Sequence, residues 1–186
     1  MRKLISALLY TALMGLANIG HTDVAAADAM RAGDMRKLVF HSAPMAGSDV
    51  TFTGEDGQDM TLADYQGKHI VLNFWATWCA PCRHEMPHLS ALQDAMGGDK
   101  MEVVTIATGR NPLPAMQRFL DEIEVDNLPL HTDPRQSLAR SLGVLGLPVT
   151  IIIDPDGNEI GRMQGDADWS SENAMAIMET LIESES

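Results

Sequence analysis

Cysteine is scarce in this chain: Cys79 and Cys82 are the only two among 186 residues. A structural zinc site needs four ligands and commonly takes them from two cysteine pairs, so the single pair argues against a zinc-stabilised fold. Attachment of c-type haem requires a histidine directly after the second cysteine, and Arg83 occupies that position. No cysteine is left over for a structural disulfide between distant segments, so we do not expect the pair to serve stability.

Basic residues and aromatic residues are also few. The chain has 13 Lys and Arg against 26 Asp and Glu, which gives a formal net charge of −13. A surface of that charge argues against nucleic acid as a partner. Although aromatic residues make up 5% of the chain, hydrophobic residues reach 45%, an ordinary fraction for a globular protein. The length fits one domain preceded by a leader.

The N-terminal hydrophobic run is short for a membrane-spanning helix. It extends over about sixteen residues from Leu4 to Ile19, whereas a bilayer span takes roughly twenty. Arg2 precedes the run and Ala27 follows it, an arrangement typical of an export signal cleaved after Ala27. We therefore predict a signal peptide over residues 1–27, with an uncleaved membrane anchor as the alternative. In either case the domain faces an oxidising compartment outside the cytoplasm, which we take to be the periplasm.

The rest of the chain separates into a lead-in and one folded domain. Residues 28–48 are polar and contain glycine and proline, so we predict a lead-in or tether and place no firm element in it. Over residues 49–186, short apolar runs alternate with helical patterns, which indicates an α/β domain. A turn at Asp56-Gly57 predicts a β-hairpin at its start. We expect further strands at 70–75, 101–107, 128–131, 149–153 and 158–163, and helices at 80–96, 114–125, 134–142 and 170–184.

The two cysteines lie where a predicted strand gives way to a predicted helix. Thiols separated by two residues in a first helical turn can close a reversible disulfide, which is a two-electron switch. Cys79 would sit at the N-cap, where free backbone N–H groups favour the thiolate and lower its pKa from about 8.5 into the range of roughly 3.5–7.5. Pro81 fits this position, because a first turn tolerates proline. Cys82 would be more buried and act as the resolving thiol.

The segment from Trp78 to Cys82, followed by Arg83, Glu85 and Pro87, resembles the TlpA/ResA branch of the thioredoxin superfamily. The resemblance implies a thioredoxin-like α/β fold, with a mixed central sheet, helices on both faces, an N-terminal β-hairpin and a central helix–strand insertion. Members of this branch are exported, often membrane-tethered bacterial thiol reductases. The segment 166–169 resembles TlpA more than ResA.

The resemblance also assigns roles around the cysteines. It implies a cis bond between Leu147 and Pro148, which would turn the backbone of Leu147 outward to pair with an extended substrate segment. Trp78 would shield the sulfurs and contact substrate, and Pro81 lies between the thiols on the same surface. We therefore expect Trp78, Pro81 and Leu147 to bind substrate and Pro148 to belong to the catalytic site.

Glu85 is the candidate proton carrier. Thioredoxins place a buried acid on the strand beneath the cysteines, whereas this chain has Asn73 there. Glu85 lies three residues after Cys82, hence on the same side of the helix, and matches the glutamate of the TlpA/ResA motif. A carboxylate near a dithiol can take or give the proton that exchange requires. The alternative is that Glu85 only complements the helix dipole.

Residues 84–88 match the H-E-x-x-H pattern of zinc peptidases. Pro87 distorts that turn and no third ligand stands out downstream, so we predict no metal centre. A looser site, in which His84 or His88 joins the two cysteines on Cu(I) or zinc, stays open as an alternative.

These features together predict a protein dithiol–disulfide oxidoreductase, a monomer that works outside the cytoplasm with its own disulfide as the only redox group. By resemblance, it would reduce cysteine pairs during assembly of the cytochrome oxidase copper site or of cytochrome c. Its electrons would come from a membrane donor of the CcdA or DsbD type. Val149 replaces the glutamate of the CcmG branch, which favours the oxidase copper site. A copper metallochaperone using the same cysteines, and a thiol oxidant, remain the alternatives.

Overall fold

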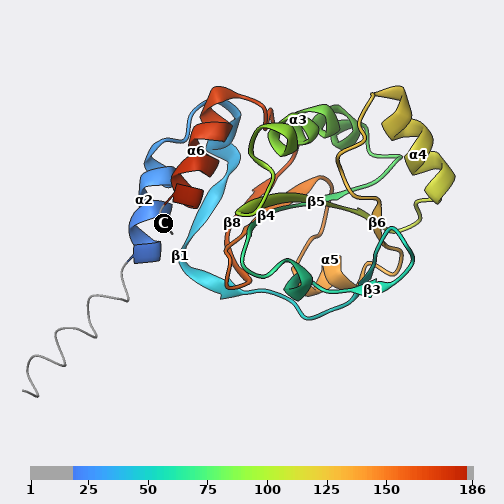
Figure 1. Cartoon of the computed structure of the whole chain (residues 1–186), viewed down its shortest axis with the longest axis horizontal. Helices are drawn as coiled ribbons and strands as arrows, with labels where there is room; N and C mark the ends of the chain where they lie inside the picture. Colours follow the sequence, from blue (N-terminus) through green and yellow to red (C-terminus); the bar gives the residue numbers. More distant parts are fainter. Residues whose placement is uncertain (1–18, 184–186) are drawn as a thin grey trace, which may run out of the picture.

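A computed structural model describes residues 19–183 as a central sheet covered by helices on both faces (Figure 1). The strands are β1 Val39–Ala46, β2 Phe52–Thr53, β3 Asp59–Met60, β4 His69–Trp75, β5 Met101–Thr108, β6 His131–Asp133, β7 Val149–Ile153 and β8 Asn158–Gln164. The helices are α2 Ile19–Ala29, α3 Ala80–Met96, α4 Leu113–Glu122, α5 Ser137–Ser141 and α6 Glu172–Glu183, with 3-10 turns η1 Gly33–Lys37 and η2 Leu62–Tyr65.

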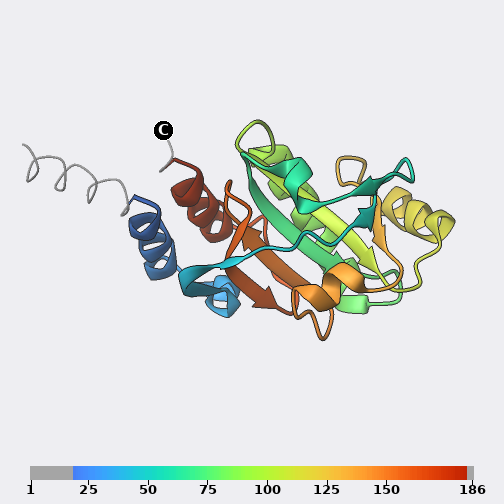
Figure 2. The same cartoon turned by 90° about the horizontal axis from the view of Figure 1, so that it is seen from below.

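The sheet is mixed and has the strand order β1-β8-β7-β4-β5-β6-β2-β3 (Figure 2). At its centre, β4 pairs in parallel with β5 and antiparallel with β7. The connection from β4 through α3 to β5 is the crossover that a parallel pair requires. This arrangement confirms the predicted thioredoxin-like fold, including the hairpin of β2 and β3.

β4 is buried along its whole length and divides the core into two parts. Val71 and Trp75 pack with α3, α4 and α6, whereas Leu72 and Phe74 pack with η2 and α5. Because successive side chains of a strand point to opposite faces, Asn73 must share the α3 face with Val71 and Trp75. The alternation of side chains along β4 therefore directs Asn73 toward α3.

Helix α3 and strand β7 have the predicted bounds, but the elements between β5 and β7 begin and end at other residues than predicted. The predicted helix over 114–125 ends at Glu122, and Glu124 follows with a φ of 55°. The predicted strand over 128–131 becomes β6, which begins at His131. The helix predicted from residue 134 begins at Ser137, because Gln136 has a φ of 57° and cannot belong to a right-handed helix.

Residues 28–48, predicted as a lead-in or tether with no firm element, belong to the folded unit. This segment contains η1 and β1, and it buries Met35 and Leu38 in the main core. β1 pairs antiparallel with β8 at the edge of the sheet. Its own side chains are mostly exposed, so the strand leaves no hydrophobic alternation in the sequence and is held by backbone pairing. The folded unit therefore begins before residue 49.

The predicted signal peptide falls mostly outside the described residues, which begin at residue 19. Its last part belongs to α2, where Ala27 is fully buried and packs in the main core. α2 lies against α6, and the Asn173 side chain bonds the backbone of Met30 and Ala32 at 2.9 and 2.8 Å. Cleavage after Ala27 stays a prediction. Within residues 19–183, no helix has the length and hydrophobicity needed to cross a membrane.

Candidate active site

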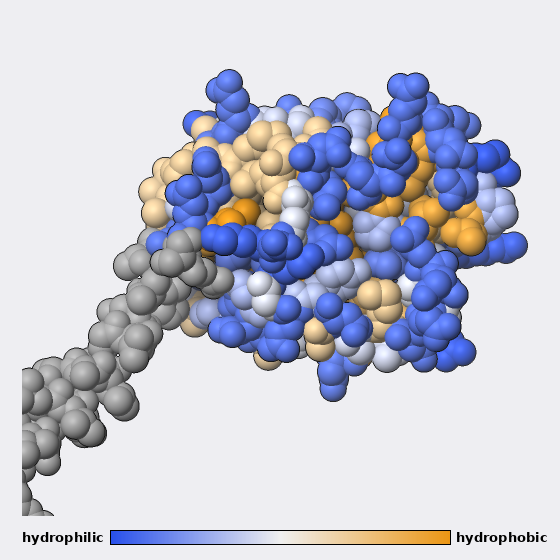
Figure 3. Space-filling view, in the orientation of Figure 1, coloured by the Kyte–Doolittle hydropathy of each residue, from blue (hydrophilic) through white to orange (hydrophobic). Residues whose placement is uncertain are grey.

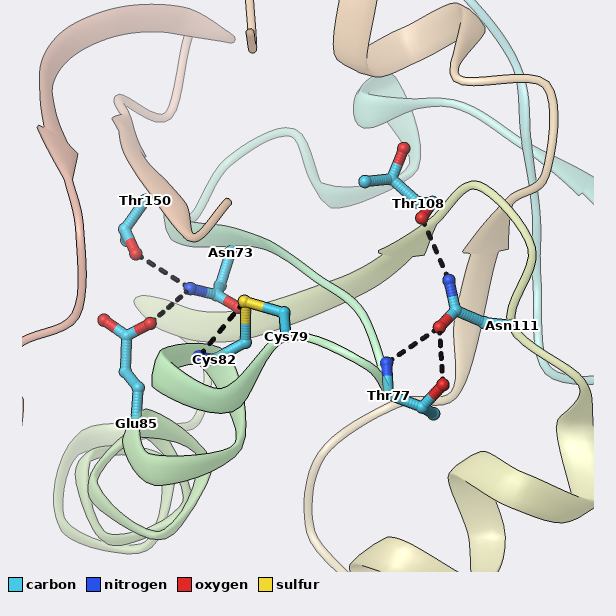
Figure 4. Close-up of a disulfide and its surroundings, with 8 residues drawn as sticks. All are labelled: Asn73, Thr77, Cys79, Cys82, Glu85, Thr108, Asn111 and Thr150. Atoms are coloured by element: carbon cyan, nitrogen blue, oxygen red, sulfur yellow. Dashed lines mark hydrogen bonds between the residues drawn. A yellow bond between two sulfur atoms is a disulfide. The ribbon is translucent and has the colours of Figure 1, made fainter. Parts of the chain in front are cut away.

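Cys79 and Cys82 form a disulfide at the start of α3, with 5.3 Å between their Cα atoms (Figure 4). Cys79 is the N-cap, as predicted, and the backbone N–H of Cys82 donates to its Sγ at 3.3 Å. Cys79 is 6% exposed and Cys82 1% exposed. The sulfur nearer the surface thus already receives a hydrogen bond from the first helical turn, and this contact favours a thiolate once the disulfide is reduced.

The residues predicted to contact substrate lie beside this disulfide. Trp78 is 66% exposed, and Pro81 is exposed in the first turn of α3. Leu147 is half-buried and lines a hollow together with Trp78. The peptide bond between Leu147 and Pro148 is cis, as predicted. The structure therefore brings the cysteines, the tryptophan and the proline loop together.

Glu85 points from α3 into the core and is fully buried. Its Oε2 accepts from Asn73 Nδ2 at 3.0 Å, and its Oε1 accepts from Trp169 Nε1 at 2.6 Å. Asn73 Nδ2 also donates to Thr150 Oγ1 at 2.9 Å, because Thr150 is the partner of Asn73 across β4 and β7 (Figure 4). Glu85 is thus held below the helix turn that carries Cys82, by side chains from β4 and the segment before α6.

Burial raises the pKa of the Glu85 carboxyl from 4.5 to about 7. Hydrogen bonds from Trp169, Asn73 and the backbone of Ala167 act in the opposite direction, because they stabilise the carboxylate. The negative charge of Asp166 adds a small further rise. A pKa near neutrality is the value that suits a general acid or base.

Sequence reasoning assigned no role to Trp169 or Thr150. Thr150 could have been found, because it follows Pro148 by two residues on the strand next to Asn73. Trp169 is separated from Glu85 by 84 positions, and no pattern in the sequence links the two residues. Their contact follows from the packing of the segment before α6 on α3.

Asn111 is a third residue to which the sequence assigned no role. Its Oδ1 accepts from the backbone N–H of Thr77 at 2.8 Å and from Thr77 Oγ1 at 3.1 Å. Its Nδ2 donates to the carbonyl of Thr108 at 2.9 Å, so the side chain bridges two loops (Figure 4). The loop that leads into Trp78 and Cys79 is thereby fixed to the end of β5.

The two histidine rings of the H-E-x-x-H pattern lie 5.7 Å apart, but the glutamate between them points away into the core. Glu85 is buried, whereas the His84 side chain is 74% exposed and its Nδ1 lies 3.4 Å from a carboxylate oxygen of Asp166. His88 Nδ1 lies 3.1 Å from a carboxylate oxygen of Asp168. The glutamate of a zinc peptidase must reach a water bound beside both histidines. This geometry excludes a zinc-peptidase site at residues 84–88.

The fold and this site define the thioredoxin-like class of proteins. A sequence profile described as the AhpC/TSA family matches residues 43–158, which is more than half of the chain. The chain belongs to the AhpC/TSA family.

Relatives agree with that assignment. The thiol-disulfide oxidoreductase ResA of Bacillus thuringiensis subsp. konkukian is 30% identical over 114 residues, covering 61% of this chain and 65% of the relative. ResA of Bacillus subtilis is 32% identical over 122 residues, covering 64% and 67%. The pneumococcal exposed lipoprotein thioredoxin of Streptococcus pneumoniae superposes with a TM-score of 0.59 at 29% identity, covering 73% of this chain and 99% of that structure. The predicted resemblance to the TlpA/ResA branch is confirmed, and the preference for TlpA within it stays a prediction.

Proposed function

We propose that this protein is an extracytoplasmic dithiol–disulfide oxidoreductase that reduces cysteine pairs in other proteins. The observation that carries the proposal is the position of the Cys79 sulfur, which caps α3 and accepts the N–H of Cys82. The relatives named thiol-disulfide oxidoreductase support it. The structure contains the oxidised form of the pair.

The first step begins from the reduced protein. The Cys79 thiolate attacks one sulfur of a substrate disulfide, so that a bond forms between the protein and the substrate while the substrate's own S–S bond breaks. The departing substrate sulfur leaves as a thiolate and takes a proton from solvent. Trp78 and Leu147, which line one hollow beside Cys79, hold the substrate segment during this step.

The second step resolves the mixed disulfide. Cys82 loses its proton to the Glu85 carboxylate and attacks the Cys79 sulfur, which forms the intramolecular disulfide and releases the second substrate thiolate. Two electrons pass to the substrate, and the protein becomes oxidised. Glu85 suits this role because its pKa of about 7 lets it accept a proton and release it again near neutral pH.

Export and electron supply belong to the same proposal. In an oxidising compartment the disulfide must be reduced again by two electrons, which we assign to a membrane dithiol donor of the CcdA or DsbD type. The predicted signal over residues 1–27 supports a periplasmic location, either soluble or tethered. The pneumococcal relative is named an exposed lipoprotein, which supports this location further. The substrates we propose are the cysteine pairs of the cytochrome oxidase copper site, with apocytochrome c as the alternative.

A trapping experiment tests the mechanism. Cys82→Ser leaves the attacking thiol but removes the resolving one, so substrates should accumulate as mixed disulfides on a non-reducing gel. Cys79→Ser is the matched control and should trap nothing. If both variants trap the same proteins equally, Cys79 is not the attacking residue and the proposed mechanism fails.

The direction of electron flow needs its own measurement. The equilibrium of the pair with glutathione gives its reduction potential, and we expect a value nearer to thioredoxin, about −270 mV, than to DsbA, about −120 mV. A potential as oxidising as that of DsbA would instead make the protein a thiol oxidant. Titration of the reduced protein with Cu(I) is the parallel test for the metallochaperone alternative.

A further inference from the structure

Trp78 separates two hollows in the surface beside the disulfide. One hollow, of about 310 Å³, lies between α3 and α4 and is lined by Arg83, Arg118 and Glu122 as well as Trp78. The other, of about 470 Å³, is lined by Arg140, Leu145 and Leu147 on the far side of Trp78. A polypeptide segment that reaches Cys79 across Trp78 would therefore pass from one hollow into the other.

Trp78 and Leu145 form an exposed apolar ridge on this surface. Leu145 is 97% exposed and Trp78 66% exposed, the two highest values among the exposed large hydrophobic side chains of residues 19–183. Figure 3 shows hydrophilic side chains over most of the visible face, with hydrophobic atoms reaching the surface around α4. The first hollow opens beside this helix.

The charged side chains that line the two hollows are mostly basic, whereas the protein as a whole is acidic. The chain has twice as many acidic as basic residues, 26 against 13, yet arginines line both hollows. Arg83 is already engaged: its guanidinium lies 4.1 Å from the centre of the Phe119 ring and 3.8 Å from a Glu122 oxygen. Arg83 and Glu122 therefore balance one another and leave Arg118 as the free charge of the first hollow.

Arg118 and Arg140 have no carboxylate partner within residues 19–183. Arg118 makes no hydrogen bond or ion pair there, and Arg140 donates only to the backbone carbonyl of Arg135 and to Gln136. Both side chains belong to exposed residues. Two uncompensated guanidinium groups thus flank the exposed apolar ridge formed by Trp78 and Leu145.

We propose that these arginines select acidic substrates: the segment that carries the target disulfide has Asp or Glu on both sides of an apolar stretch at the cysteine. One carboxylate contacts Arg118, the other contacts Arg140, and the apolar part lies on Trp78 and Leu145. This inference rests on the proposed reductase function and adds the substrate's chemistry to it. Charge pairs at the edge of an interface act mainly on specificity and on the rate of encounter.

Single-turnover kinetics with synthetic peptides test this selection. Each peptide contains one internal disulfide flanked by Glu, Gln or Lys and is otherwise identical, and the reduced full-length protein is the only electron source. At about 0.1 M salt the screening length is about 10 Å, so distant carboxylates of the protein contribute little. We expect second-order rate constants in the order Glu, Gln, Lys, with about a threefold step between neighbours.

Two variants and one control connect the preference to the proposed residues. Arg118→Gln and Arg140→Gln should each lower the rate with the Glu peptide about two- to threefold and leave the Gln peptide unchanged. Arg36→Gln makes the same change in net charge on η1, next to β1 at one edge of the sheet and outside the lining of both hollows, and should change neither rate. At about 1 M salt the preference should disappear, because screening then acts over about 3 Å.

The outcomes separate the two proposals. If the double variant keeps the same ratio of Glu to Gln rates, or if Arg36→Gln lowers that ratio equally, the acidic-substrate inference is overturned while the reductase proposal stands. If the arginine variants instead abolish a concentration-dependent dimer, the surface binds a second acidic copy of the chain and the inference is likewise overturned. If no peptide is reduced faster than by Cys79→Ser, the reductase function itself fails.

Discussion

Trp169 donates its indole N–H to Glu85 across 2.6 Å, and both side chains are fully buried in the core. The contact joins the segment before α6 to the helix that carries both cysteines. A buried carboxylate without donors would remain protonated well above neutral pH, because burial disfavours its charge. Trp169 and Asn73 lower that cost and keep Glu85 in the range where it can exchange protons.

Replacing Glu85 should change how stability depends on pH. The folded pKa of about 7 lies above the ordinary 4.5, so the folded state holds this proton more tightly than the unfolded state. The raised pKa of Glu85 therefore adds about 3 kcal/mol to the free energy of unfolding below pH 4.5, and this contribution is lost as the pH rises through 7. Glu85→Gln should remove this fall, as measured by urea unfolding of the oxidised protein at pH 4.5 and pH 8.

The exposed Glu122 provides the control for that experiment, since its side chain is 67% exposed. Glu122→Gln should keep the wild-type difference between the two pH values. A Glu85→Gln profile parallel to wild type would mean that Glu85 does not titrate with a raised pKa.

Trp169→Phe keeps an aromatic ring but removes the hydrogen-bond donor. The pKa of Glu85 should rise further, because the bond from Trp169 lowers it. At pH 8, where the carboxylate is charged, the variant should lose about 1.5–3 kcal/mol of unfolding free energy, and less at pH 5. Trp75→Phe is the matched control, because Trp75 is equally buried and its Nε1 has no hydrogen-bond partner in residues 19–183. Equal pH dependence in the two variants would contradict the role of the indole N–H.

Asn111 should stabilise the loop before the disulfide through the bonds it makes to Thr77 and Thr108. Asn111→Ala leaves the N–H of Thr77 and the carbonyl of Thr108 without that partner, so we expect a loss of about 1–3 kcal/mol in unfolding free energy. Thr77→Val removes only the hydroxyl bond and should cost less. Urea unfolding of both variants checks this order, and a larger loss for Thr77→Val would refute it.

Much of the fold could be predicted because its central elements have strong local signals. β4 is a continuous apolar run, and α3 begins at a capping cysteine and has the bounds that its periodicity predicts. β1 was missed because an edge strand is stabilised by backbone pairing to β8 rather than by a buried face. The displaced insertion has a similar cause: the left-handed backbone at Glu124 and Gln136 is unusual for residues other than glycine, and the sequence does not signal it.

The residues of the candidate site also differ in whether the sequence alone could indicate them. The cysteines, Trp78 and Pro148 lie in short motifs, so the sequence alone indicated them. Glu85 followed from helical spacing, but its pKa depends on burial and on Trp169, which only the packed structure brings into contact. Asn111 joins Thr77 from 34 positions away, and a loop-to-loop contact at that separation has no sequence pattern.

The most direct test is the pH dependence of alkylation of the reduced protein, followed residue by residue with mass spectrometry. The account predicts that Cys79 reacts first, with a thiol pKa well below the value of about 8.5 for a free cysteine, because α3 supplies the N–H of Cys82 to its sulfur. Cys82 should remain protected. Alkylation of Cys79 with the rate and pH profile of an unstructured peptide thiol would contradict the account.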